Sequence, residues 1–269
     1  MTRTPALLGE AVSLWRMRPL LAAMTRRELA ARIAGSAGGL LWLWLPPLAT
    51  VAAYFLVFDV VFGMRLGEHA PTPRVGTYLV VGMLAWTAFA DALQRGMNSL
   101  LEAGPMLQKN PLPPALFPAR AVLASAVVFA PLMMALVLLY AGAHGFRSGV
   151  FSVPALVLLQ SLLSFFLAYL LAILAAALRD VAQVVGLLLS LGVFLSPILF
   201  PVSMFPASWR WLLWLNPMTG PILGYQSALL QGAWPGREVW LALAVWLVLL
   251  AGLLSLALAR SRDQLADWL

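Results

Sequence analysis

Few side chains in this sequence of 269 residues could carry out acid–base, nucleophilic or metal chemistry. There is no cysteine, and the two histidines, His69 and His144, lie far apart in short segments between apolar runs. The ten acidic residues form no close pair within an apolar stretch. Catalysis by acids, bases or nucleophiles requires such pairs or an activated nucleophile. The sequence therefore predicts no catalytic site and no metal site on this chain.

A nucleotide site is also excluded, because a phosphate-binding loop has the pattern G-x-x-x-x-G-K-[ST]. The one lysine is Lys109, which follows Gln108 rather than a glycine. Any step driven by ATP would therefore be performed by another polypeptide.

Three charged residues lie in or near apolar runs, where a charge is costly unless it is paired or faces a polar cavity. Asp91 precedes Arg95 by one helical turn, so the two side chains can neutralise each other. This pair is either structural or part of a transport path. Asp59 lies near the end of an apolar run, and either reaches the membrane interface or faces the path.

Aromatic side chains recur at helical spacing, and such rings can stack on the apolar faces of sugars without burying charge. The candidates for a substrate path are Tyr54, Phe58, Phe62, Phe165, Phe166, Tyr169, Phe194 and Phe200. The same spacing suits rings that pack against lipid, and the sequence leaves this alternative open.

The composition places these residues in a membrane. Apolar residues (AVILMFWYC) make up 62% of the chain and charged residues 10%, whereas soluble domains carry about 25% charged residues. The net charge is +7, but no basic run is interleaved with aromatic residues. We therefore expect no nucleic-acid partner, and assign the charge to loops that face anionic lipids.

Six apolar runs are long enough to cross the hydrocarbon core, which takes about 20 residues. They are Leu40–Phe62, Tyr78–Leu100, Ala121–Gly142, Val153–Leu178, Val181–Phe200 and Val239–Ala259. Residues 201–238 contain five prolines, which break any long helix. We predict an all-α integral membrane fold with six transmembrane helices, in a single domain over residues 1–269.

The basic residues predict the orientation. With the N-terminus inside, 12 basic residues fall on the inner side and five on the outer side, as the positive-inside rule requires. The outer five are Arg65, Arg74, Arg147, Arg210 and Arg237. Both termini are therefore expected in the cytoplasm.

Residues 6–20 have the pattern of an amphipathic helix. Leu7, Leu14 and Trp15 fall on one face, and Glu10 and Arg16 on the other. This pattern predicts a helix that lies on the cytoplasmic membrane surface. A helix packed on a partner protein is the alternative.

Several short motifs also occur in an order typical of one transporter family. They are Arg26-Arg27-Glu28-Leu29-Ala30-Ala31-Arg32, Leu178-Arg179-Asp180-Val181, Phe194-Leu195-Ser196-Pro197-Ile198-Leu199-Phe200-Pro201 and Leu215-Asn216-Pro217-Met218. Over nearly its whole length the chain resembles the permease subunit of ABC-2 type transporters that export polysaccharides, such as O-antigen, capsule and teichoic acid.

The resemblance implies a homodimer of permeases with two copies of an ABC ATPase subunit. That partner would hold ATP and Mg²⁺, and this chain would hold no cofactor. The resemblance also implies a coupling segment at residues 98–118, whose prolines leave the extent of its helix open, and re-entrant outer helices within 201–238. The residues expected to contact the ATPase are Arg26, Arg27, Glu28, Arg32, Leu101, Glu102, Lys109, Arg179 and Asp180.

The expected function is export of a lipid-linked polysaccharide across the bacterial cytoplasmic (inner) membrane, where the chain would also contact membrane lipids. One alternative is an ABC-2 permease for a drug, a lipid or a lipo-oligosaccharide. A more remote alternative is a membrane-embedded enzyme that acts on lipid-linked sugars.

Overall fold

The computed structural model describes residues 6–39, 41–66, 71–110, 112–144 and 147–261. The α-helices are α1 (Ala6–Arg16), α2 (Arg18–Ile33), α3 (Leu41–Phe55), α4 (Val75–Leu107), α5 (Leu116–His144), α6 (Val153–Ala177), α7 (Val181–Gly192), α8 (Arg210–Leu213), α9 (Thr219–Gln226) and α10 (Arg237–Ser261). Short π-helices follow α3 and α9, at η1 (Leu56–Val61) and η5 (Ser227–Gln231), and 3-10 turns form η2 (Ser148–Ser152), η3 (Val202–Met204) and η4 (Ala207–Trp209). The all-α prediction is confirmed for the described residues, in which Arg65 and Arg74 form one isolated bridge.

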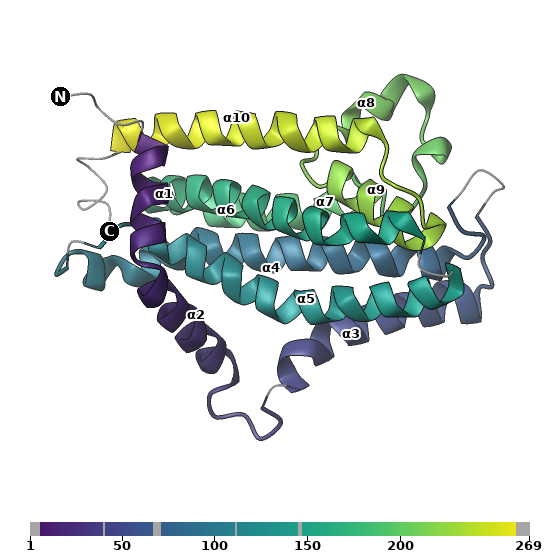
Figure 1. The fold of residues 1–269 in the computed structure, drawn as a ribbon, viewed down its shortest axis with the longest axis horizontal. Helices are drawn as coiled ribbons and strands as arrows, with labels where there is room; N and C mark the ends of the chain where they lie inside the picture. The colour runs from purple at the N-terminus through teal and green to yellow at the C-terminus, as the bar shows by residue number, and fades with distance from the viewer. Residues whose placement is uncertain (1–5, 40, 67–70, 111, 145–146, 262–269) are drawn as a thin grey trace.

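The long helices run side by side, and α4 is the centre of the bundle (Figure 1). It packs against α5 and α6, while α10 packs against α6. The helix α1 crosses one end of this bundle, and α2 slopes away from the same end (Figure 1). At the opposite end lie α8 and the segments around it.

Small residues allow α4 to approach its neighbours closely. A Cβ atom added to Gly96 would lie 2.6 Å from the Cβ atom of Ala168 on α6, so only glycine fits this crossing without a shift. The most apolar window of α4 is 72% buried, whereas that of α3 with η1 is 6% buried. The chain therefore has one span enclosed by its own helices and one that is almost entirely uncovered.

Five helical segments in the described part of the chain are long and apolar enough to cross a membrane. They are Leu41–Val61, Val75–Leu107, Leu116–Tyr140, Ser148–Ala177 and Arg237–Ser261. These agree in position with five of the six predicted spans, and they are consistent with an integral membrane protein.

The predicted span Val181–Phe200 is different, because its helix α7 ends at Gly192 after 12 residues. Twelve residues extend about 18 Å, which is shorter than the hydrocarbon core of about 30 Å. A Cβ atom on Gly192 would lie 2.5 Å from the Trp86 ring, and the Ser196 hydroxyl donates to the Gly192 carbonyl. Turns that lead to Pro197 and Pro201 replace the second half of the predicted span.

The boundary expected at Leu100 is absent, because α4 continues without a break to Leu107. The first half of the expected coupling segment, residues 98–118, is therefore the C-terminal end of this helix. The next helix begins at Leu116 and ends at His144, so His144 closes α5 rather than lying in a loop. His69 lies outside the described residues.

The proline-rich segment 201–238 contains only short helices, as its sequence predicted. Its middle part, α9 with η5, is buried against α4, α6 and α10. The helix α8 lies nearer the surface, at the end of the molecule opposite α1 (Figure 1).

Candidate functional site

A group of charged side chains joins α2 to α4 and α5 near the α1 end of the bundle. Asp91 on α4 accepts a hydrogen bond from Arg95 at 2.8 Å, which is the pair expected from the spacing. Its second carboxylate oxygen accepts from Arg32 on α2 at 3.1 Å and from the Ser125 hydroxyl on α5. Arg32 also donates to the Ser125 oxygen, at 3.2 Å. Sequence spacing indicated Arg95 but not Arg32, which is 59 residues from Asp91.

The group extends through longer ion pairs. Glu28 on α2 lies 3.9 Å from Arg32 and 3.8 Å from Arg120 on α5. Arg120 also lies 4.0 Å from Glu102 on α4. We refer to Glu28, Arg32, Asp91, Arg95, Glu102, Arg120 and Ser125 as the charge cluster. It connects an outlying helix to two helices of the bundle.

The side chains of the charge cluster differ in burial, and burial sets how much each ion pair contributes to stability. The Arg32 side chain is 6% exposed, and this burial lowers the pKa of its guanidinium, while the nearby Asp91 carboxylate raises it. A guanidinium keeps its proton in proteins, so the cost of burying Arg32 must be met by the carboxylate beside it. Arg95 is more exposed, and its pair with Asp91 is worth less.

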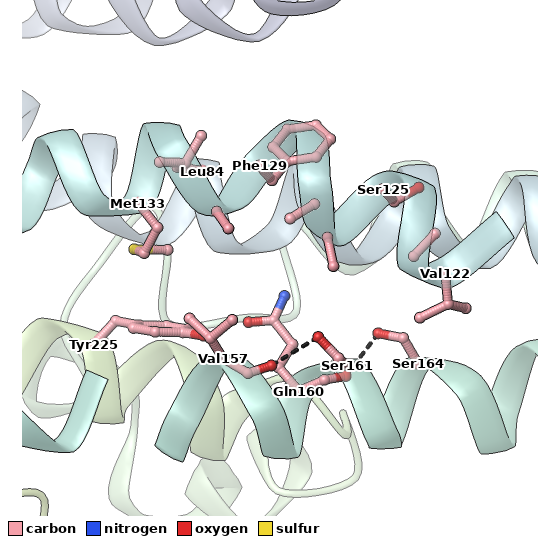
Figure 2. A pocket seen from close by; sticks show the side chains of 14 residues that line it. Leu84, Val122, Ser125, Phe129, Met133, Val157, Gln160, Ser161, Ser164 and Tyr225 are labelled. Atoms are coloured by element: carbon pink, nitrogen blue, oxygen red, sulfur yellow. Dashed lines mark hydrogen bonds between the residues drawn. The ribbon is translucent and has the colours of Figure 1, made fainter. Parts of the chain in front are cut away.

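A small pocket with mainly apolar walls adjoins the charge cluster between α4, α5 and α6 (Figure 2). Its volume is about 40 Å³, which leaves room for about three water molecules. Ser125 lies toward one end and Tyr225 toward the other, and the Gln160 side chain rises from α6 between them (Figure 2). The Gln160 amide nitrogen donates to the Ala85 carbonyl at 3.0 Å, but its amide oxygen is buried without a donor. The pocket thus has mainly apolar walls, with Ser125, Gln160 and Ser161 among its few polar side chains.

The predicted aromatic path divides into separate groups. On α3 and η1, the rings of Tyr54 and Phe58 stack with centroids 6.1 Å apart, and Phe62 continues this row at 6.2 Å from Phe58. Phe62 is 64% exposed, and Phe58 is half-buried. This row lies on the least covered span of the chain.

The aromatic residues of α6 lie elsewhere. Phe165 is 5.9 Å from Phe166 and 6.0 Å from Tyr169, and all three line a cavity beneath α1. Phe194 is exposed just after α7, whereas Phe200 stacks on Phe205 at 5.6 Å. Among the described residues, the structure does not join the eight predicted rings into one continuous surface within the chain.

Asp59 has a structural contact at the end of the bundle where α4 begins. Its carboxylate accepts a hydrogen bond of 2.7 Å from the backbone N–H of Gly76, in the first turn of α4. That N–H has no partner within the helix, so the carboxylate acts as a cap supplied from η1. The other Asp59 oxygen is buried without a hydrogen bond.

Two of the sequence motifs meet at the end of the bundle opposite α1. The Asn216 amide donates to the Ser196 hydroxyl oxygen at 2.6 Å, and its own carbonyl accepts from the Met218 N–H at 2.9 Å. Tyr78 and Gln226 each donate to the Pro197 carbonyl at 2.8 Å. These contacts hold the turn after α7 against α4 and α9. Sequence spacing did not indicate Tyr78 or Gln226, because each lies far from Pro197 along the chain.

The residues expected to contact an ATPase fall into two sets. Arg26, Arg27, Glu102, Lys109, Arg179 and Asp180 are exposed, and Leu101 is half-buried. Glu28 and Arg32 instead point toward the bundle and belong to the charge cluster. Within the described ranges, no three His, Asp or Glu side chains lie close enough together to hold a metal ion.

Comparison with known proteins places this arrangement in a family. Residues 19–230 match the ABC-2 type transporter family. The chain is 30% identical to the O-antigen export system permease protein RfbA of Myxococcus xanthus over 259 residues, which cover 94% of this chain and 96% of that protein. It is 24% identical to a protein of the same name from Klebsiella pneumoniae over 216 residues, 79% of this chain and 81% of the relative. Because the family match covers most of the sequence, this chain belongs to the ABC-2 type transporter family.

Proposed function

We propose that this chain is the permease subunit of an exporter that moves a lipid-linked polysaccharide, of the O-antigen type, across the bacterial inner membrane. The observation that carries the proposal is the 30% identity to an O-antigen export permease along 94% of this chain and 96% of the relative. Because the alignment covers nearly all of both chains, we expect this chain to share the architecture of that permease over its whole length. The driving force comes from an ATPase on a separate subunit, as the missing phosphate-binding loop requires.

The working unit in this proposal is two permeases and two ABC ATPase subunits, with both permease termini in the cytoplasm. The exposed surface of α3 supports a second copy, since a 6% buried window leaves room for another subunit on that span. The buried segment of α9 and η5 acts as the re-entrant outer part, and α7 with the turn after it serves as the short fifth crossing.

The ATPase docks in this proposal at the α1 end, on the exposed residues Arg26, Arg27, Glu102, Lys109, Arg179 and Asp180 and on the half-buried Leu101. Glu28 and Arg32 have a different part. They connect α2 to α4 and α5, so movement of a docked ATPase reaches the bundle through the charge cluster.

The sugar path lies in this proposal on the uncovered side of the chain, where the Tyr54, Phe58 and Phe62 row and Phe194 stand. The rings of Phe165, Phe166 and Tyr169 are assigned instead to the cavity beneath α1. Replacing Tyr54 and Phe58 by alanine should slow glycan export, while Phe151→Ala, an exposed ring on η2, should leave export unchanged.

Reconstitution tests the function. The chain is co-purified with the ATPase, placed in proteoliposomes, and assayed for ATP hydrolysis with lipid-linked O-antigen, with the free glycan and with an amphiphilic drug. Stimulation by the lipid-linked glycan alone supports the proposal. Stimulation by the drug favours the alternative permease, and turnover of a lipid-linked sugar without ATPase favours a membrane enzyme.

The docking surface has its own test. The double variant Arg26→Glu and Arg27→Glu should lower co-purification of the ATPase tenfold or more. In this proposal the two arginines face acidic side chains of the ATPase, and like charges that face each other across an interface cost several kcal/mol. Arg65→Glu at the other end of the bundle is the matched control. Equal retention of the ATPase by both variants would contradict this placement.

A further inference from the structure

A cavity separates the crossing helix α1 from α6. Its volume is about 440 Å³, within the size range of pockets that bind small ligands. Its walls are mainly apolar and include Leu14 from α1 and Leu162, Phe165 and Phe166 from α6. The helix α1 packs against α10 on its other side. The helix α1 therefore covers the cavity without packing directly against α6.

One polar atom in the wall lacks a partner. Tyr169 on α6 is fully buried, with 0% of its surface exposed, and its hydroxyl makes no hydrogen bond in the described part of the chain. A buried donor without an acceptor costs about 1–3 kcal/mol. The cavity therefore offers a hydroxyl that would donate to an acceptor from outside the protein.

The cavity also has a cation at its edge. Arg18 lines it, and the guanidinium lies over the Trp15 ring, 5.0 Å from its centroid. Both residues are exposed, and Arg18 donates to no acceptor among the described residues. Glu10 also lines the cavity and carries the opposite charge. A tryptophan at the end of the crossing helix α1 and an arginine at the start of α2 are typical of the depth of lipid headgroups.

We propose that this cavity binds one phospholipid from the leaflet at the α1 end of the bundle. An acyl chain fills the space between α1 and α6, Arg18 binds the phosphate, and an ester carbonyl accepts the hydrogen bond from Tyr169. Basic side chains at the membrane surface attract anionic lipid headgroups, and Arg18 is the basic side chain in this wall. The lipid is a resident ligand that holds α1 on the bundle, so the site does not depend on which cargo the permease moves.

The test uses the full chain in phosphatidylcholine vesicles that contain a phosphatidylglycerol with a photoactivatable diazirine at the end of one acyl chain. After illumination, the labelled peptides are mapped by mass spectrometry. We expect labelling of residues 162–169 to exceed labelling of the outward face of α10 at Val245 and Val248, which are 64% and 74% exposed.

Labelling of variants distinguishes a lipid bound in the cavity from lipid of the surrounding bilayer. Ala11→Trp fills the cavity from α1 and should abolish labelling of residues 162–169, whereas Val12→Trp, on the same helix but outside the cavity, should not. Arg18→Gln and Tyr169→Phe should each lower this labelling about fivefold, the effect of losing one headgroup charge or one hydrogen bond.

Two results would overturn the proposal. One is labelling of α6 and α10 to the same extent, which is the pattern of bulk lipid. The other is labelling of residues 162–169 that persists in Ala11→Trp while Arg18→Gln and Tyr169→Phe also have no effect. Because the readout involves neither ATP nor glycan, either result leaves the proposed export function untouched.

Discussion

Asp91 compensates two guanidinium groups of unequal burial. Arg32 is 6% exposed and Arg95 is 44% exposed, and both bind the same carboxylate. The Asp91→Asn substitution would leave the buried Arg32 with only the longer ion pair to Glu28, at 3.9 Å. We expect a loss of about 3 kcal/mol in the stability of the purified chain, measured by thermal unfolding in detergent.

Arg95→Gln is the control for this prediction, because it removes only the exposed partner and should cost less than about 1 kcal/mol. Adding Arg32→Gln to Asp91→Asn should restore part of the lost stability, since the stranded charge is gone. Equal losses from Asp91→Asn and Arg95→Gln would show that Arg32 does not depend on this carboxylate.

Asp59 gives a second prediction at the residue scale. Its carboxylate accepts from the Gly76 N–H, so Asp59→Ala should cost about 1 kcal/mol, as the loss of a helix cap does. Asp59→Asn keeps an acceptor oxygen and should cost clearly less. The measurement is amide hydrogen exchange at the start of α4. Equal protection of Gly76 in both variants would argue against a capping role.

The sequence predicted one ion pair of Asp91 but not the other, for a physical reason. Asp91 and Arg95 are one helical turn apart, and this spacing alone brings them together. Arg32 reaches Asp91 only because α2 folds back on α4 and α5, which depends on the packing of the whole chain. Among the candidate sites, local pairs were therefore predictable and long-range partners such as Ser125 and Arg120 were not.

At the scale of elements, the end of α7 depends on one close contact. Gly192→Ala would place a Cβ atom 2.5 Å from the Trp86 ring, and we expect a loss of about 1–3 kcal/mol from this overpacking. On the same helix, the Cβ position of Gly186 has no atom within 4 Å. Gly186→Ala should therefore be neutral or stabilising, by up to about 1 kcal/mol. Thermal unfolding of both variants makes the comparison, and a loss of similar size at Gly186 would refute this explanation.

Hydropathy located the long helices well, but two helix ends differ from the ends of the apolar runs. After Leu100 the residues become more polar, yet they still favour a helix, so α4 extends to Leu107. From Val193 to Phe200 the residues stay apolar, yet Pro197 and the Trp86 contact end the helix. An apolar run predicts that a segment lies in the membrane. Backbone geometry and packing decide at which residue its helix ends.

At the scale of the whole molecule, the orientation is open to a direct test. The chain has no cysteine, so a single introduced cysteine can be labelled without background. Arg27→Cys on α2 and Trp211→Cys on α8 are both at exposed positions, at opposite ends of the bundle. In intact spheroplasts, a membrane-impermeant maleimide should label position 211 and not position 27. Labelling only at position 27 would reverse the proposed topology.

The length of α4 also governs how movement passes through the molecule. Its 33 residues extend about 50 Å, well beyond a hydrocarbon core of about 30 Å, and its one proline, Pro105, lies close to the inner end. A stiff rod held near its middle is a lever, so a sideways push on one arm swings the other arm the opposite way. Asp91 lies at the midpoint of α4, Glu102 lies toward its Leu107 end, and the Tyr78 contact with Pro197 lies near its Val75 end. Tilting of α4 about its middle would therefore carry a movement from the Leu107 end to the Val75 end without any change in that helix's own fold.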